Sequence, residues 1–297
     1  MPVKWTSTRS EAFLSDAQGR HHVTEASIAM DKEGNFLGVK VVTVAAVGAY
    51  LSQYGIFIPT LAGAGMHVGV YKIPVLYNKV NVVYTNTVPV DAYRGAGRPE
   101  ASYVIERLVD KAADDLGIDP VELRVKNFVQ PDEIGKHEGA ILPLDSCDFK
   151  KTTEMSMVNS SYDDFLKRKE ESKLENKLRG IGISYYIERT QGEGAENSRV
   201  VISGEGSVKV FAGTQATGQG HETAWTQILV EKLGVNPEDV SIHFGNSDDL
   251  PGGGGTGGSK SLYMAAGAIN DASNAIAPQT SSGPSASRRR TRPGAFH

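Results

Sequence analysis

Cysteine, long apolar runs and an excess of one charge are all nearly absent from this sequence of 297 residues. A single Cys147 excludes an intrachain disulfide framework and any cysteine-rich metal or iron–sulfur site made by this chain alone. The apolar stretch nearest to a membrane span, residues 41–50, is short and contains Thr43 and Gly48, so we expect no span. The net charge of -4 gives no indication of nucleic-acid binding, and we expect no nucleic-acid partner.

The N-terminal residues lead into no apolar core of the kind that a signal peptide has, and we expect a cytoplasmic protein. The 39% of hydrophobic residues suffices for a real core. Glycine, in contrast to cysteine, is abundant: there are 33, of which 20 follow Arg179. Because glycine loses backbone entropy on folding, such clusters indicate tight turns or close approach of the backbone to a ligand.

The pattern of apolar and turn residues predicts an α+β chain with two mixed α/β regions. Residues 1–130 contain a hairpin that turns at Glu33-Gly34-Asn35, a strand over 79–85, a helix over 99–117 and a short helix capped by Asp119. Residues 180–276 contain a hairpin over 199–211, a helix over 221–233, a strand over 240–244 and a helix over 260–275.

Two further segments differ from these regions in composition. Residues 131–179 are largely polar, with 10 charged residues among the 15 of 163–177, and we expect a connector that carries an exposed helix. Residues 277–297 contain four arginines, many Ser and Pro, and no acidic residue. They suit either a basic nucleic-acid-binding or targeting tail or an unfolded end that arises by truncation or frameshift, and we favour a disordered, anomalous tail.

Glycine-rich loops precede two of the predicted helices, at residues 213–220 and 246–258. A helix N-terminus offers unpaired N–H groups and the positive end of the helix dipole, and glycines let the oxygens of an anion approach them. The pair of loops therefore indicates a ligand with several phosphates or a large polar cofactor. Structural turns are the alternative for either loop taken alone.

Neither loop matches the P-loop of nucleotide-binding proteins. Gln219 and Gly220 stand where that motif has Lys and Ser/Thr, and Ser259 replaces the glycine before Lys260. Residues 252–257 match the dinucleotide pattern G-x-G-x-x-G formally, but other residues separate them from the preceding strand.

A third loop, residues 91–100, holds Arg94 and Arg98 around two glycines between a strand and a helix. An arginine there presents a planar fork to an oxyanion or carbonyl, and we favour Arg94 for that role. For Arg98, a surface ion pair with Glu100 or Asp91 is the alternative. The histidines are scattered without metal-ligand spacing, so we expect no protein-ligated metal, and Cys147 is interpreted as an ordinary residue.

Several long motifs resemble one family. Ala92-Tyr-Arg-Gly-Ala-Gly-Arg-Pro-Glu-Ala101, residues 119–127, Gly213-Thr-Gln-Ala-Thr-Gly-Gln-Gly-His-Glu-Thr223 and residues 252–261 resemble, in order, segments of the molybdenum hydroxylase large subunit. This family includes xanthine dehydrogenases, aldehyde oxidases and aerobic carbon monoxide dehydrogenases. The resemblance implies that residues 1–130 are the C-terminal part of a first molybdopterin-binding domain. Residues 180–276 would be the N-terminal part of a second, within an internal fragment of the subunit.

The resemblance also implies roles for individual residues. It places Arg94 beside the molybdenum, where the family uses this arginine to orient substrate. The pterin contacts would come from Gly218, Gln219 and Gly220. The pterin or nucleotide phosphates would be lined by Thr256, Gly257, Gly258, Ser259 and Ser261. Bacterial members with three subunits carry the cytosine dinucleotide form of molybdopterin, which would explain two loops suited to anions.

The implied reaction is oxidation of an aldehyde, an N-heteroaromatic compound or CO by Mo–OH attack and hydride transfer to Mo=S. Electrons would then leave through an iron–sulfur small subunit and an FAD medium subunit. Copper-carrying carbon monoxide dehydrogenases place a cysteine where this chain has Gly95, which favours the first two substrates over CO. The glutamate base of the family lies outside the matched motifs, and a general base contributes about 10²–10⁴-fold, so we expect the isolated chain to be inactive. A noncatalytic truncated remnant and a P-loop-like nucleotide-binding protein are the alternatives.

Overall fold

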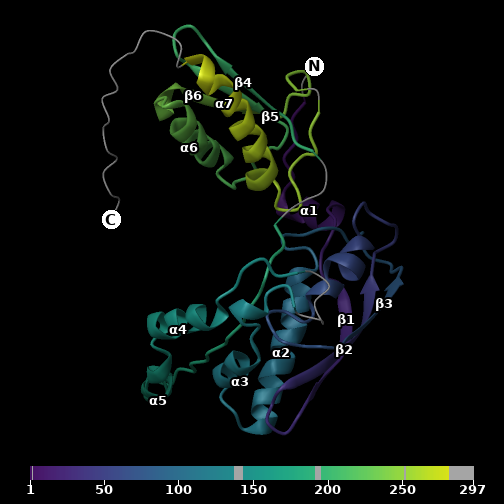
Figure 1. Ribbon diagram of the computed structural model, residues 1–297. Helices are drawn as coiled ribbons and strands as arrows, with labels where there is room; N and C mark the ends of the chain where they lie inside the picture. The colour runs from purple at the N-terminus through teal and green to yellow at the C-terminus, as the bar shows by residue number, and fades with distance from the viewer. Residues whose placement is uncertain (2, 137–142, 191–194, 251, 281–297) are drawn as a thin grey trace. The chain divides into compact units, whose positions relative to one another are not determined.

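The computed structural model of the protein describes residues 1, 3–136, 143–190, 195–250 and 252–280. The chain divides into two compact units, Met1–Glu188 and Arg189–His297, and each is described by itself. Figure 1 shows the elements of both units along the chain. Among the described residues, no helix is long and apolar enough to cross a membrane.

The first unit contains a three-stranded sheet and its helices: α1 (Arg9–Ser15), β1 (His22–Met30), β2 (Phe36–Ala46), β3 (Leu76–Val83), α2 (Arg98–Leu116), α3 (Pro120–Asn127), α4 (Phe149–Ser160) and α5 (Phe165–Leu174). A π-helix (Ile58–Ala62) and a 3-10 turn (Ala64–Met66) lie between β2 and β3, and further 3-10 turns cover Pro131–Glu133 and Tyr162–Asp164.

The predicted hairpin is confirmed as the antiparallel pair β1 and β2. Asp31 closes its turn, because its carboxylate accepts hydrogen bonds from the backbone N–H of Asn35 at 2.8 Å and from its side-chain amide at 2.7 Å. Gly34 supplies the left-handed backbone, with φ +80°. β3 pairs with β2 in parallel, which places β2 in the centre of the sheet.

One face of this sheet is covered by α2, as the first unit in Figure 1 shows. Val39 and Val41 of β2 belong to the same buried cluster as Ile105 and Val109 of α2. Tyr71 and Phe128 extend the cluster, with ring centroids 5.9 Å apart in a stacked pair. This core holds the start of α2 in place, and the loop with Arg94 leads directly into that helix.

A buried charge cluster brings residues after 179, where the expected connector ends, into the first unit. Arg124 of α3 is fully buried, and its guanidinium donates to the Glu106 carboxylate at 3.0 Å and to Asp110 at 2.8 Å. The same guanidinium donates to the Ile183 carbonyl at 3.3 Å, and the Glu106 carboxylate accepts the Tyr185 N–H at 3.0 Å. Part of the expected connector, with the residues after it, therefore packs into the first unit.

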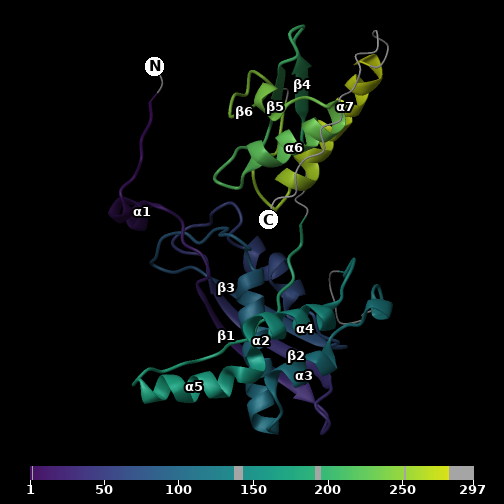
Figure 2. The same ribbon diagram turned by 90° about the vertical axis from the view of Figure 1, so that its left-hand side faces the viewer.

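The second unit contains β4 (Ser198–Ile202), β5 (Val208–Ala212), α6 (His221–Leu233), a 3-10 turn (Pro237–Asp239), β6 (Val240–Phe244), a π-helix (Ser261–Ala265) and α7 (Ala266–Thr280). β4 and β5 form the predicted hairpin, and β6 pairs with β5 in parallel. Both α6 and α7 lie on one face of this sheet (Figure 2). Their buried residues, among them Trp225 and Ile269, contact Val208 and Val210 of β5.

The described part of the last helix differs from its prediction at both ends. A π-helix replaces the first turn of the helix expected over 260–275, and α7 continues to Thr280. The rest of the expected tail, residues 281–297, lies outside the described residues.

Candidate functional site

The loop with Arg94 is anchored by the side chain of Asp91. Its carboxylate accepts hydrogen bonds from the Ser52 hydroxyl, from the Tyr54 N–H at 3.1 Å and from the Ala92 N–H at 2.6 Å. Burial by itself would raise the pKa of Asp91, but these bonds to its ionised form hold that pKa below its usual range.

A run of left-handed residues then turns the chain into α2. Gly95, Ala96 and Gly97 have φ of +89°, +32° and +92°. The Ala96 N–H donates to the Tyr93 carbonyl at 2.7 Å, and the Gly97 N–H donates to the Glu100 carboxylate at 2.9 Å. Gly97 is buried and Ala96 is half-buried, whereas Arg94 is exposed.

Gly97 is also where the loop contacts the π-helix. A Cβ at Gly97 would lie 2.6 Å from the Gly63 nitrogen and 2.8 Å from the Ile58 carbonyl oxygen. The two backbones thus touch where only glycine fits.

Arg98 does not form either ion pair that the sequence suggested. Its Nε lies 3.3 Å from the Glu188 carboxylate, while Glu100 lies 3.7 Å from Arg20 and Asp91 accepts from the loop itself. The sequence could not show this, because Glu188 is distant along the chain and only the return of residues 183–188 to the first unit brings it near.

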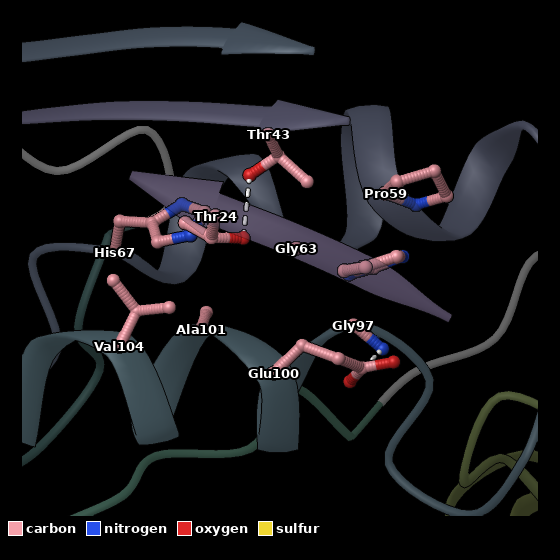
Figure 3. Close-up of a pocket in the computed structure, with 10 residues that line it drawn as sticks. Thr24, Thr43, Pro59, Gly63, His67, Gly97, Glu100, Ala101 and Val104 are labelled. Atoms are coloured by element: carbon pink, nitrogen blue, oxygen red, sulfur yellow. Dashed lines mark hydrogen bonds between the residues drawn. The ribbon is translucent and has the colours of Figure 1, made fainter. Parts of the chain in front are cut away.

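A small pocket lies beside the start of α2. Figure 3 shows Thr24 and Thr43 on its sheet side, with hydroxyl oxygens 3.1 Å apart, and His67 and Glu100 around it. The pocket has room for water rather than for a cofactor. Burial lowers the pKa of His67, the Ala64 carbonyl opposes this, and the positive form of His22 adds to it. Among the described residues, no group of three His, Cys, Asp or Glu could hold a metal ion.

In the second unit the two glycine-rich loops lie against each other. A Cβ at Gly213 would lie 2.9 Å from the Gly253 Cα, so the loop backbones touch there. The Thr256 hydroxyl accepts the Gln215 N–H at 2.8 Å and donates to the Gln215 carbonyl at 2.6 Å. The sequence predicted both loops but not their contact.

A buried ion pair holds the backbone of the second glycine-rich loop. Lys260 Nζ lies 2.8 Å from Glu196 Oε1, and their side chains are only 5% and 0% exposed. The same oxygen accepts the Gly254 N–H at 3.0 Å. Lys260 is thus held inside the unit rather than presented to a phosphate, which argues against the P-loop-like alternative.

Most of the residues predicted to bind cofactor lie on the open side of these loops. Exposed residues are Gly218, Gln219, Gly220, Thr256, Gly257, Gly258 and Ser259. Ser261 is buried at the start of the π-helix. Gln219 turns back on its own loop, where its carboxamide oxygen accepts the Thr217 N–H. Around Gly218, Gly220 and Gly257, a Cβ would meet nothing within 4 Å.

The N-terminus of α6 carries features that the sequence did not reveal. Trp225 and Leu229 are fully buried, and the aliphatic Ala224 and Ile228 pack against the same core. His221 is buried and stacks on Trp225, with ring centroids 4.7 Å apart. His221 Nδ1 and the Thr214 hydroxyl are buried and have no hydrogen-bond partner among the described residues. Helical spacing of aliphatic residues indicates this face of α6, but it does not reveal the aromatic pair at the start of the helix.

Cys147 is half-buried, and its thiol contacts the Val129 carbonyl at 3.7 Å. Burial, with the neighbouring acidic groups of Asp148 and Glu133, raises its pKa. A thiol with a raised pKa is a poor nucleophile at neutral pH, in agreement with its interpretation as an ordinary residue.

Residues 1–128 and residues 156–282 each match the molybdopterin cofactor-binding domain family. The chain belongs to the molybdenum hydroxylase large-subunit family and contains two molybdopterin cofactor-binding domains.

Individual relatives agree with this assignment. The chain is 29% identical to the 6-hydroxypseudooxynicotine dehydrogenase complex subunit gamma of Paenarthrobacter nicotinovorans, over 93% of this chain and 35% of the relative. It is 31% identical to the carbon monoxide dehydrogenase large chain of Afipia carboxidovorans, over 93% of this chain and 36% of the relative. The crystal structure of quinoline 2-oxidoreductase from Pseudomonas putida superposes with a TM-score of 0.84 at 28% identity, over 92% and 36%. The chain thus spans about a third of the length of these relatives.

Proposed function

We propose that this chain supplies molybdopterin-binding domains to a molybdenum hydroxylase that oxidises an aldehyde or an N-heteroaromatic compound. The observation that carries the proposal is the joined pair of glycine loops, whose open side lies at the N-terminus of α6. Gly220 caps that helix in a left-handed conformation, with φ +74°. Backbone N–H groups at such an end suit the oxygens of a phosphate or pterin.

The residues fit the cofactor in two respects. The loops leave space where side chains would otherwise lie, at Gly218, Gly220 and Gly257. Buried polar atoms without partners among the described residues lie in the first loop, at Thr214 Oγ1, and at the start of α6, at His221 Nδ1, and a polar group could satisfy them. We assign pterin binding to Gly218, Gln219 and Gly220, and contacts with the pterin or a nucleotide phosphate to Thr256, Gly257, Gly258, Ser259 and Ser261. The second set suits the cytosine dinucleotide form.

When bound, the cofactor supplies a two-electron oxidation of a substrate carbon, with oxygen taken from water. The chain itself supplies Arg94, whose exposed guanidinium can donate to a substrate carbonyl or ring nitrogen and so orient it. Arg94 lies in the loop that Asp91 anchors. A donor must be held in a fixed place if it is to orient a substrate.

The geometry at Gly95 supports an organic substrate rather than CO oxidised at a copper-bound cysteine. Gly95 has φ +89°, and a Cβ there would lie 2.7 Å from Pro99 Cγ. A cysteine at this position would therefore be strained by its backbone and would collide with the start of α2. Turnover of an aldehyde or purine, and none of CO, is the expected result for the complete enzyme.

Partner subunits would carry the remaining electron-transfer groups, iron–sulfur clusters on a small subunit and FAD on a medium subunit. The lone Cys147 cannot supply an iron–sulfur site, and the relatives are named as the gamma subunit of a complex and as a large chain. A cytoplasmic location is part of the same proposal.

A pair of glycine variants tests cofactor binding. Gly257 and Gly204 both have open space around the Cβ position and neither has a left-handed backbone, so valine fits the fold at both. The chain is purified from a host that makes molybdopterin cytosine dinucleotide, and its molybdenum and pterin are measured. We expect Gly257→Val to lose most of both and Gly204→Val to retain them. A wild-type chain without pterin, or equal retention by both variants, contradicts the proposal, and ATP binding in calorimetry would instead favour a nucleotide-binding protein.

A further inference from the structure

The segment that leads into β1 runs beside the loop with Arg94. The Gln18 N–H donates to the Pro89 carbonyl at 2.9 Å, and the Asp91 N–H donates to the Gln18 carbonyl at 2.9 Å. Two residues later, Arg20 adopts a left-handed backbone with φ +61°, which is uncommon for a residue with a side chain. This conformation accompanies a side chain that lies along the loop.

The guanidinium of Arg20 contacts the Arg94 loop at three points. Its Nη2 donates to the main-chain carbonyl of Arg94 itself. Its central carbon lies 4.8 Å from the centroid of the Tyr93 ring, in a cation–π contact. Its Nε lies 3.7 Å from the Glu100 carboxylate, which also accepts the Gly97 N–H at 2.9 Å.

We propose that Arg20 is a positioning residue for Arg94: its guanidinium bridges the Arg94 carbonyl and the Glu100 carboxylate and so fixes the direction in which the Arg94 side chain leaves the loop. The inference rests on the proposed function of Arg94. Glu100 ties the bridge to the first turn of α2, and Asp91 anchors the other end of the loop. Arg94 is thus held by its main chain while its side chain stays exposed.

The chemistry of the bridge requires a guanidinium. Arginine offers donors in a rigid planar fork, so one group can donate a hydrogen bond to a carbonyl while it forms an ion pair with a carboxylate in a fixed relative direction. Lysine keeps the positive charge over Tyr93 and near Glu100 but lacks the fork. Arg20→Lys therefore separates the charge from the bridging geometry.

Hydrogen exchange of the purified full chain, followed by mass spectrometry, tests the inference. The Ala96 N–H bond to Tyr93 and the Arg98 N–H bond to Gly95 report on the loop. Loss of one charge-assisted bond is expected to speed their exchange about tenfold in Arg20→Ala, with the strands β1 and β2 unchanged. Arg107→Ala is the matched control, because Arg107 is an exposed arginine of α2 that pairs only along its own helix with Asp110 in the described structure.

Arg20→Lys keeps the test decisive if the alanine variant folds poorly. We expect it to retain the melting temperature of the wild type and the faster loop exchange of the alanine variant. A merely structural role predicts the opposite pattern, a lower melting temperature with exchange raised throughout β1 and β2. Wild-type loop exchange in Arg20→Lys, or equal acceleration in Arg107→Ala, overturns the bridge.

A second measurement separates this inference from the proposed function. In the molybdenum-loaded complex, Arg20→Lys is expected to lower kcat/KM about tenfold at unchanged molybdenum content, while Arg107→Lys leaves it unchanged. Faster loop exchange with no change in kcat/KM would show that the loop does not orient substrate and would overturn the role of Arg94. Unchanged loop exchange overturns the role of Arg20, whatever the molybdenum content.

Discussion

The Thr256 hydroxyl bonds both backbone groups of Gln215, donating to its carbonyl at 2.6 Å and accepting from its N–H at 2.8 Å. The two residues are 41 positions apart in the chain. A single small side chain therefore joins the two glycine-rich loops, and it does so with the pairing that a neighbouring strand would otherwise provide.

Replacing this hydroxyl should loosen the loops. Thr256→Val keeps the shape of the side chain but removes both bonds, and we expect it to lower the free energy of unfolding of the second unit by about 1 kcal/mol, since water can reach the exposed groups. Pterin content should fall with it. Thr256→Ser, which retains the hydroxyl, is the control in urea unfolding and pterin assays. Equal behaviour of the two variants would show that the bonds contribute nothing.

Two glycines at the ends of α2 should differ in their tolerance of alanine. Both glycines have a left-handed backbone, Gly97 at φ +92° and Gly117 at φ +63°. Backbone strain in either alanine variant should therefore lower the free energy of unfolding by about 1–2 kcal/mol. Only at Gly97 would the added Cβ meet other backbone, 2.6 Å from the Gly63 nitrogen, whereas a Cβ at Gly117 would meet nothing within 4 Å. Gly97→Ala should therefore destabilise the first unit more than Gly117→Ala does. Chemical unfolding measures both, and similar losses would refute the backbone contact.

Breaking the buried pair of Glu196 and Lys260 should be costly. Lys260→Met leaves the Glu196 carboxylate buried without its cation, and we expect a loss of about 3–5 kcal/mol. The double variant Glu196→Gln with Lys260→Met should recover part of this loss. Arg199, whose pair with Asp249 is exposed, is the control, and Arg199→Met should cost less than about 1 kcal/mol. A small effect of Lys260→Met in urea unfolding would contradict a buried ionised pair.

Acid should weaken the first unit through the pocket beside α2. Burial holds the pKa of His67 below 6.5, and the pKa of His22 is lowered chiefly by burial as well, against the opposing charge of Glu100. The folded state thus binds fewer protons than the unfolded state. The stability that these groups contribute is full above pH 6.5 and is lost as the pH falls through their folded values.

The matched variants are His67→Gln, which removes one of these groups, and His243→Gln, which removes an exposed histidine of the second unit. Urea unfolding across pH 7 to about 5 should show a shallower loss of stability only in His67→Gln. The same slope in both variants would exclude His67 as a source of the acid sensitivity.

Elements with strong local signals could be predicted from the sequence with the bounds that the structure shows. The helix α6 is one, because left-handed glycines flank it at Gly220 and Gly234. The strand β6 is another, since its apolar residues alternate with polar ones. Both depend only on neighbours along the chain.

Contacts between distant residues could not be predicted. Thr256 with Gln215, Lys260 with Glu196 and Arg98 with Glu188 are each defined by the packing of loops that have no periodic pattern. The connection from β2 to β3 is similar, because a π-helix and a 3-10 turn carry no helical spacing of apolar residues.

The charge cluster around Arg124 has a consequence for how the chain folds during synthesis. Arg124 lacks one hydrogen-bond acceptor until Ile183 supplies its carbonyl, and Glu106 lacks one donor until Tyr185 supplies its N–H. Until the ribosome has released these residues, two charged side chains must stay hydrated or enter an apolar interior with bonding groups unsatisfied. The last partner of Arg124 in α3 therefore follows 59 residues later, and the last partner of Glu106 in α2 follows 79 residues later. The first unit therefore becomes fully stable only after residues 183–185, which lie within the second family match, have been made.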